Sequence, residues 1–345
     1  MKKQAILISI ISILIIVGCE KKVEENSFSF AFITDAHLAP NLGSIREWEL
    51  VAPRESLVQT PFVGYQRVLD EIKGRSVDFI ITGGDDVELL TYELPPINGI
   101  HPVTEDFNAL DECVKEMTEI EKSIGLPFYH TIGNHQSFEY PPAKPDHPLY
   151  GQGWFNKYWG DDGRAYYSFD MNGWHFIILS THDKKKINNR AWLGISDEQV
   201  KWLKDNLNKT GRKTPVVLVA HVPFDRESIQ DDFDKIGKVL KDYNVKLGLC
   251  GHAHGYREFI WNGIPCVVGS SLSGSVWSVV RNVNDATYLN NADQGYLILS
   301  VSGDEIEWKH YPFTYNIEKY FYEKTGKRPG AVSKYWYSRN ETKAN

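Results

Sequence analysis

The sequence of 345 residues is poor in sulfur, with four cysteines and three methionines. Four thiols are too few for the dense disulfide framework of a small secreted domain, so the fold has to rest on a buried apolar core. No apolar run reaches the roughly 20 residues that a membrane-spanning helix needs. The longest run covers residues 5–17. These shortages exclude a disulfide-stapled scaffold and a polytopic membrane protein.

An excess of positive charge is also lacking. Lys and Arg total 38 against 45 for Asp and Glu, which gives a formal net charge of −7. Such a balance provides no global attraction for nucleic acid, so long nucleic acid is not an expected partner. An anionic substrate would need local positive charge, from metal ions or an arginine cluster. The 42% hydrophobic and 24% charged residues are ordinary for a globular protein and exclude intrinsic disorder.

The first 18 residues have the pattern of an export signal. Lys2 and Lys3 precede the apolar run at 5–17, and Gly18 and Cys19 follow it. With a small residue directly before the cysteine, the segment resembles a bacterial lipoprotein signal. This resemblance implies cleavage before Cys19 and lipid attachment to its thiol. An ordinary secretory signal and an uncleaved anchor are the alternatives.

We therefore expect an extracytoplasmic protein that is lipid-anchored to a bacterial membrane, in the periplasm or at the cell surface. The chain divides into a signal peptide at 1–18, a lipidated tether at 19–27, one domain at 28–311 and an aromatic, basic extension at 312–345. Three cysteines remain beyond the lipid site, an odd number without a full disulfide framework. They are Cys113, Cys250 and Cys266.

Strand-like and helix-like segments alternate along the domain. Apolar runs typical of buried strands occupy residues 28–34, 77–82, 128–132, 216–220 and 245–250. Apolar residues spaced by three or four predict helices at 65–72, 107–124, 196–207 and 233–240. The dipeptides Asn172-Gly173 and Asn262-Gly263 predict hairpins between further strands. The alternation favours an α/β fold with its active groups at strand ends.

Each of the five apolar runs ends in a polar cluster. The clusters are Asp35-Ala36-His37, Gly84-Asp85-Asp86, Gly133-Asn134-His135, His221-Val222-Pro223 and Gly251-His252-Ala253-His254. One such cluster is weak evidence, but together they hold five of the 11 histidines. If the five strands are neighbours in one sheet, these side chains converge at one edge. Oxygen and nitrogen ligands without thiolate suit Mn, Fe or Zn, and their number suits two ions.

In this order, the motifs D-x-H, G-D, G-N-H, H-x-P and G-H-x-H closely resemble the calcineurin-like metallophosphoesterase superfamily, over about residues 28–311. The resemblance implies a metallophosphoesterase domain built as a four-layer α/β/β/α sandwich, with a two-metal site above its sheets. By position it implies these ligands: Asp35, His37 and His254 for the first ion, Asn134, His221 and His252 for the second, and Asp85 bridging both. His135 then matches the histidine that contacts phosphate and protonates the leaving oxygen.

The function implied by the resemblance is hydrolysis of phosphoesters by a metal-bridging hydroxide. Small soluble phosphoesters are the expected substrates, because the negative charge balance disfavours long nucleic acid. A phosphodiesterase or nuclease working at the membrane surface is one alternative. A non-catalytic metal-binding lipoprotein that has kept the fold is another.

Two positions depart from the family pattern. Gln136 follows His135 where the family usually has Asp or Glu. Because a carboxylate there can orient and charge the imidazole, we expect weaker acid assistance from His135. Glu88 stands where purple acid phosphatases have a tyrosine, so their tyrosinate-coloured ferric site is not expected. Outside the motifs, we expect His182 and Asp183 to lie in a solvated loop rather than in the cleft wall.

Overall fold

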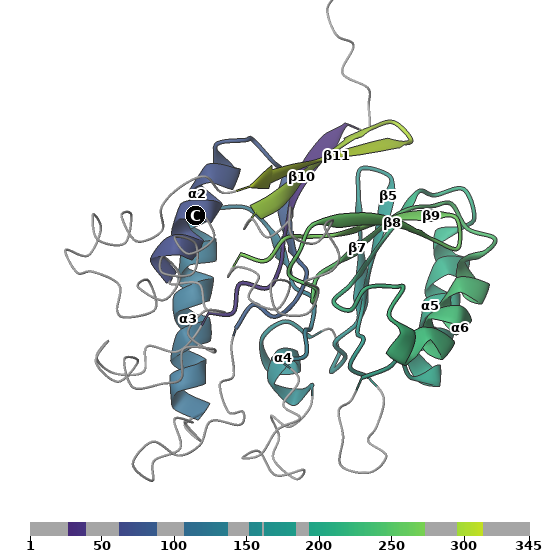
Figure 1. Ribbon diagram of the computed structural model, residues 1–345, viewed down its shortest axis with the longest axis horizontal. Helices are drawn as coiled ribbons and strands as arrows, with labels where there is room; N and C mark the ends of the chain where they lie inside the picture. Colours follow the sequence, from purple (N-terminus) through teal and green to yellow (C-terminus); the bar gives the residue numbers. More distant parts are fainter. Residues whose placement is uncertain are drawn as a thin grey trace, which may run out of the picture.

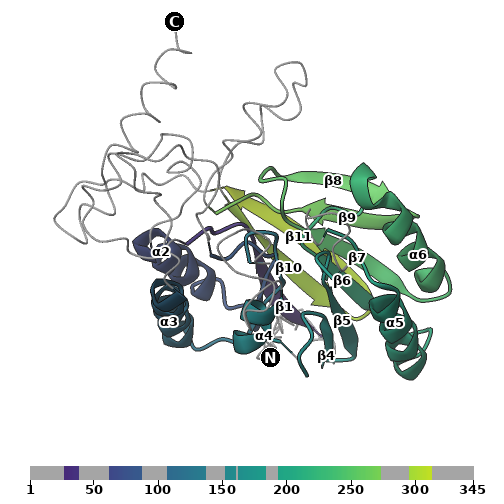
Figure 2. The ribbon, with the colours of Figure 1, turned by 90° about the horizontal axis from the view of Figure 1, so that it is seen from below.

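The computed structural model describes residues 27–38, 62–87, 107–136, 152–160, 162–183, 193–272 and 295–312. The expected signal peptide, Cys19 and Glu88 lie outside these residues, as does nearly all of the expected extension at 312–345. Two β-sheets lie between two pairs of helices (Figures 1 and 2). Among the helices that the structure describes, none is long and apolar enough to cross a lipid bilayer.

The first sheet has the strand order β11-β10-β1-β2-β3. Its strands are β1 (Phe28–Ile33), β2 (Phe79–Thr82), β3 (Phe128–Tyr129), β10 (Gly295–Ser302) and β11 (Glu305–Pro312). The strands β1, β2 and β3 are parallel, whereas β10 is antiparallel to both of its neighbours. The loops that leave β1, β2 and β3 therefore emerge from the same end of the sheet.

The second sheet has the order β4-β5-β6-β7-β9-β8. Its strands are β4 (Tyr167–Met171), β5 (Trp174–Leu179), β6 (Val216–Ala220), β7 (Val245–Cys250), β8 (Arg257–Trp261) and β9 (Ile264–Val268). The hairpins β4–β5 and β8–β9 close the two edges, while β5, β6, β7 and β9 run parallel. Both hairpins turn at the predicted Asn-Gly pairs.

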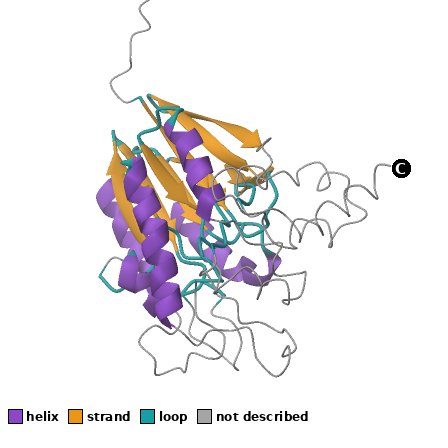
Figure 3. Cartoon of the chain, turned by 90° about the vertical axis from the view of Figure 1, so that its left-hand side faces the viewer, coloured by secondary structure: helices purple, strands orange, loops and turns teal. Residues whose placement is uncertain are grey.

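Helices cover the outer face of each sheet. The structure describes α2 (Phe62–Lys73), α3 (Phe107–Ile124), α4 (Gly153–Tyr158), α5 (Asp197–Thr210), the short 3-10 helix η1 (Glu227–Ile229) and α6 (Gln230–Leu240). Helices α2 and α3 lie beside the first sheet, and α5 and α6 lie beside the second (Figure 2). Seen from the side of α2 and α3, helices lie in front of the strands (Figure 3).

The alternation of side chains along β1 explains why two sheets pack face to face. Phe30 and Phe32 point into the apolar layer between the sheets, and Ala31 and Ile33 point toward α2 and α3. In the inter-sheet layer, Phe30 stacks on a ring of β2 at a centroid distance of 4.9 Å. Full burial of each such ring contributes about 1.5–3 kcal/mol. A third apolar layer lies under α5 and α6, which confirms the four-layer α/β/β/α sandwich.

The five motif-bearing strands are divided between the two sheets, so the condition of one shared sheet is not met. β1, β2 and β3 belong to the first sheet, whereas β6 and β7 belong to the second. The motifs still meet, because the carboxyl ends of these strands face the same side of the sandwich. The site therefore lies across the line where two sheets adjoin, a placement that the pattern of one strand cannot reveal.

Candidate metal centre

The loops after β1 and β2 continue the pairing of their strands. The backbone N–H groups of Asp35, His37 and Leu38 donate to the carbonyl oxygens of Gly84, Asp85 and Asp86 at 2.9, 2.8 and 2.9 Å. These bonds hold the D-x-H motif against the G-D motif residue by residue. Backbone pairing rather than side-chain contact thus sets the distance between the first two motifs.

Five of the predicted ligands adopt a left-handed backbone conformation. The φ angles are 54° for Asp35, 47° for His37, 54° for Asp85, 67° for His252 and 59° for His254. Such conformations cost about 1–3 kcal/mol each for residues other than glycine and persist only where the surrounding structure enforces them. Five of them in one place indicate a site whose geometry is selected at the expense of stability.

Two motif glycines are required by close packing. A Cβ atom on Gly133 would lie 2.1 Å from Asp85 Oδ1, and one on Gly251 would lie 2.1 Å from Thr34 Oγ1. Contacts this short would push the first two motifs out of place. Gly133 therefore allows two loops of the first sheet to approach each other, and Gly251 allows a loop of the second sheet to approach the first.

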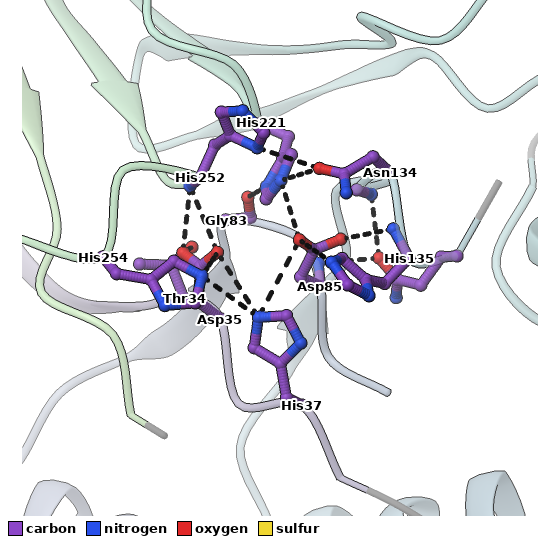
Figure 4. Close-up of polar contacts among 12 residues, drawn as sticks. Thr34, Asp35, His37, Gly83, Asp85, Asn134, His135, His221, His252 and His254 are labelled. Carbon is purple, nitrogen blue, oxygen red and sulfur yellow. Dashed lines mark hydrogen bonds and ion pairs between the residues drawn. The ribbon is translucent and has the colours of Figure 1, made fainter. Parts of the chain in front are cut away.

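Asp35, His37 and His254 form the first ligand cluster (Figure 4). The Nε2 atom of His254 lies 3.1 Å from Asp35 Oδ1 and 3.2 Å from Nε2 of His37. The Thr34 hydroxyl donates to Asp35 Oδ2 at 2.5 Å, and the His252 N–H donates to the same oxygen at 3.0 Å. These two donors hold Asp35 Oδ2 in place, while Oδ1 faces the imidazoles of His37 and His254.

The second ligand cluster joins Asp85, Asn134, His221 and His252. Asn134 Oδ1 lies 3.1 Å from His221 Nε2 and 2.9 Å from His252 Nδ1. The same His221 nitrogen lies 3.1 Å from Asp85 Oδ2. Four potential ligands from four loops and both sheets thus surround one small volume (Figure 4).

Asp85 lies between the two clusters. Its Oδ2 atom lies 3.1 Å from His221 Nε2 and 3.9 Å from His37 Nε2, so it faces an imidazole of each cluster. Its Oδ1 atom accepts the N–H of His135 at 2.8 Å. This placement is what a bridging carboxylate requires, and it supports that role for Asp85.

Both carboxylates of the centre are buried and stay ionised. Burial by itself would raise the pKa of Asp35, but the charge and hydrogen bonds of His254 and His37 hold that pKa well below its ordinary value. Burial acts in the same direction on Asp85, and there His221 and His135 hold the pKa far below the usual range. Two buried anions framed by imidazoles are suited to binding cations.

Without a bound ion, the two imidazoles of the second cluster, His221 and His252, differ in protonation. Burial would lower the pKa of His221, but the Asp85 carboxylate outweighs burial and raises it to about 9. Burial and the neighbouring charge of His221 lower the pKa of His252 to about 3. His252 is therefore neutral, the form that binds a metal, whereas His221 would release a proton on binding.

The orientation of His221 fits a metal ligand. Its Nδ1–H donates to the carbonyl oxygen of Gly83 at 2.7 Å, which aims Nε2 at Asp85 and Asn134. A second hydrogen bond of this kind is how proteins fix the ring of a metal-bound histidine. The donor set of imidazole nitrogens and carboxylate or amide oxygens therefore fits two divalent ions of the Mn, Fe or Zn type.

His135 differs from the ligands in its accessibility. Its side chain is 33% exposed, whereas the ring of His37 beside it is fully buried. The two rings are in edge contact at 4.7 Å between centroids, and His135 Nε2 lies 3.9 Å from Asp85 Oδ2. A partly exposed imidazole at the rim of a buried centre is suited to contact a substrate.

Gln136 binds the loops that carry the predicted ligands. Its side chain is buried, and its Oε1 atom accepts the N–H groups of Asp85 and Gly133 at 2.9 and 2.8 Å. Its Nε2 atom donates to Asp86. The Gln136 amide thus binds the ligand loops, and the weaker acid assistance expected from its lack of charge stays a prediction.

The expectation for His182 and Asp183 is wrong. His182 is 1% exposed, and its ring lies 6.2 Å from that of His221. Burial and the charge of His221 lower its pKa well below the ordinary value. Asp183 is half-buried and accepts the amide of Gln199 at 3.0 Å. The signal in the sequence was the position of this pair: His182 stands three residues after the end of β5, as Asp85 stands three residues after the end of β2.

Comparisons with known proteins agree with this geometry. A family model described as calcineurin-like phosphoesterase matches residues 28–256. The chain is 28% identical over 192 residues to a probable purple acid phosphatase from Arabidopsis thaliana, covering 50% of this chain and 40% of that protein. It is 26% identical over 177 residues to a probable glycerophosphodiester phosphodiesterase from Arcobacter nitrofigilis, covering 49% of this chain and 60% of that protein.

Among solved structures, a dimetal phosphatase from Danio rerio matches with a TM-score of 0.51 over 83% of this chain and 96% of that chain. At 13% identity this likeness concerns the fold alone. The chain spans 40% and 60% of the two curated relatives, so their activities are not transferred to it directly. The family match is broader and contains all five motifs, from Asp35 to His254. The chain belongs to the calcineurin-like phosphoesterase family, whose members depend on two metal ions.

Proposed function

We propose that the protein hydrolyses phosphoesters with two divalent metal ions. The observation that carries this proposal is the convergence of seven oxygen and nitrogen ligands, from five loops and two sheets, around the buried carboxylate of Asp85. The first ion would be held by Asp35, His37 and His254. The second would be held by Asn134, His221 and His252, and Asp85 would serve both.

The chemistry then divides between the ions and the chain. When bound, two divalent ions supply Lewis acidity, which neutralises phosphate charge and lowers the pKa of a coordinated water. In hydrolysis an oxygen of water joins phosphorus, its proton passes to solvent, and the bond from phosphorus to the leaving oxygen breaks. His135, on the exposed rim, binds the phosphate and gives a proton to the leaving oxygen. The uncharged Asn134 provides a ligand oxygen without repelling the substrate.

Small soluble phosphoesters are the substrates that we propose. The net charge of −7 supports this choice, because it gives no broad attraction for a polyanion. A phosphodiesterase acting at the membrane surface is the second candidate, favoured by the similarity to the glycerophosphodiester phosphodiesterase. A non-catalytic metal-binding lipoprotein is the third candidate, and its basis in the sequence is the uncharged Gln136 after His135.

Attachment to a membrane through a lipid on Cys19 is a further part of the proposal. It is supported by the basic start, the short apolar run at 5–17 and the Gly18-Cys19 pair. Expression in a bacterium with radiolabelled palmitate tests it. Label in the wild-type protein and its loss in Cys19→Ser are expected, and an unlabelled wild-type protein would disprove lipidation.

The activity is tested on purified protein that has been stripped of metal and reloaded with Mn²⁺, Zn²⁺ or Fe²⁺. Hydrolysis of p-nitrophenyl phosphate and of bis-p-nitrophenyl phosphate is then compared. Metal-dependent turnover supports the proposal, and the ratio of the two rates separates a monoesterase from a diesterase. Failure of the folded protein to bind metal would overturn it.

A further inference from the structure

A single side-chain oxygen links the loops after β2 and β3. Gln136 Oε1 accepts the N–H of Asp85, the proposed bridging ligand, at 2.9 Å. It also accepts the N–H of Gly133, the residue before the proposed ligand Asn134, at 2.8 Å. The two donors are 48 positions apart in the sequence and are held by one buried amide. The distance between two ligand loops therefore depends on where this amide is held.

The nitrogen of the Gln136 amide donates to an oxygen that already faces two other donors. Gln136 Nε2 donates to Asp86 Oδ2 at 3.3 Å. The same oxygen accepts the Thr82 hydroxyl at 2.9 Å and faces His130 Nδ1 at 3.0 Å. Asp86, Thr82 and Gln136 are all buried. Only a donor at position 136 suits this oxygen, since an acceptor there would lie buried against a second acceptor without a proton between them.

Asp86 is in turn fixed to the helical layer through His130. The two ring nitrogens of His130 face Asp86 Oδ2 at 3.0 Å and Glu121 Oε2 at 3.4 Å, so the ring is an imidazolium between two carboxylates. Glu121, on α3, accepts the hydroxyl of Tyr65 on α2 at 2.8 Å. The ring of Trp159 stacks on the imidazolium at 4.2 Å. The Asp86 carboxylate that accepts the Gln136 amide is thus connected through His130 to α2 and α3.

We propose that Asp86 and Gln136 are a matched acceptor–donor pair that positions the ligand loops of the metal centre. Asp86 is the reason that an amide, rather than the carboxylate usual in the resembling family, stands after His135. The inference rests on the proposed function in one respect, because it takes Asp85 and Asn134 as metal ligands. Gln136 is a positioning residue, since it touches the ligand loops and not the substrate.

Because Asp86 accepts and Gln136 donates, the effects of substituting each residue can be predicted. Gln136→Glu keeps the acceptor for Asp85 and Gly133 but turns a second acceptor toward Asp86. Asp86→Asn keeps one acceptor oxygen but removes the charge that holds the Gln136 amide and the His130 ring. In the double variant Asp86→Asn/Gln136→Glu the polarity is reversed, because the new asparagine amide donates to the new carboxylate and to Nδ1 of a His130 ring that is then neutral and keeps its proton on Nε2, facing Glu121. The two single changes are therefore expected to be harmful and their combination to be less harmful than either.

The experiment is a double-mutant cycle read out with Co²⁺ alone. Co²⁺ affinity and the visible absorption of bound Co²⁺ report on the ligand geometry, and the melting temperature in chelator reports on the fold. We expect each single variant to bind Co²⁺ about 10- to 100-fold more weakly than the wild type, the usual range for partners that support metal ligands. The double variant should recover most of the affinity and the wild-type spectrum.

Gln66→Glu is the matched control. Gln66 Nε2 donates to Asp70 Oδ1 at 3.1 Å on the exposed surface of α2, so the same change of donor to acceptor occurs there in water. This variant should bind Co²⁺ as the wild type does. If Gln136→Glu behaves like Gln66→Glu, or if the two single effects simply add in the double variant, the pairing is wrong.

Two further outcomes keep the test decisive. Should Gln136→Glu alone fail to fold, a folded double variant that binds Co²⁺ supports the pair, and an unfolded double variant overturns it. If the wild type itself binds no Co²⁺, the proposed function fails. The melting temperatures of the cycle then still decide whether Asp86 and Gln136 are coupled.

Discussion

The Nε2 atoms of His37 and His254 face each other at 3.2 Å inside a buried site. The Oδ1 atom of Asp35 lies 3.1 Å from one of them and 3.8 Å from the other. Two ring nitrogens and a carboxylate at these distances are held together either by a shared proton or by a shared cation. A cation satisfies all three at once, so the first cluster should depend on metal for much of its stability.

Removal of metal should therefore lower both activity and melting temperature. A ligand that binds only the folded state, at a free concentration 1,000 times its dissociation constant, stabilises by about 4 kcal/mol. Calorimetry with and without chelator measures the loss, and restoring Mn²⁺ should reverse it. Equal melting temperatures under both conditions would contradict a metal centre built from Asp35, His37 and His254.

The substitution His135→Ala should separate catalysis from metal binding. His135 lies on the exposed rim and is not among the proposed ligands, so metal content and melting temperature should stay close to wild type. Turnover should fall about 100-fold or more, the usual contribution of a general acid. Steady-state kinetics with metal analysis checks both, and unchanged turnover would remove His135 from the mechanism.

Asp85→Asn should have the opposite signature. Asp85 is buried between both clusters, so loss of its charge should lower the occupancy of the two metal positions together. Elemental analysis after gel filtration measures the metal content of the variant. Asp205→Asn, an exposed change on α5, is the control and should retain both ions. Full occupancy in Asp85→Asn would exclude the bridging role.

The stability of the metal-free protein should depend on pH through His130. Burial would lower the pKa of His130, but Glu121 and Asp86 outweigh it and raise it to about 10. This pKa exceeds the value of about 6.5 for histidine in the unfolded chain. The charged His130 ring therefore stabilises the fold fully below about pH 6.5. This stabilisation is lost as the pH rises toward 10.

Urea unfolding of the wild type and of His130→Asn at pH 6, 8 and 10 tests this dependence. The difference in unfolding free energy between the two proteins should be largest at pH 6 and should shrink as the pH rises. A difference that does not change with pH would mean that the His130 ring carries no charge between Asp86 and Glu121.

Local signals in the sequence predicted many elements well. Asn262-Gly263 predicted a hairpin, and the structure pairs Trp261 with Ile264 around it. The helix predicted at 196–207 is α5, and Ser196 caps it by accepting the N–H of Gln199 at 3.1 Å. In a capping box the residue at 199 would also bind back to the Ser196 backbone, but the Gln199 side chain binds Ser180 and Asp183 instead. The local capping rule therefore applies to the Ser196 side chain but not to that of Gln199, which has tertiary partners.

The sequence by itself determined the ligand types, their order and the alternation of strands and helices, because these follow from local composition and from spacing along the chain. Only the tertiary structure decided that the motifs meet across two sheets, that His182 is buried beside His221 and that Gln136 binds the Asp85 and Gly133 loops. Gln136 and Asp86 are 50 positions apart in the sequence. Whether such groups touch depends on strand order and on burial, which chain folding sets through contacts between distant segments.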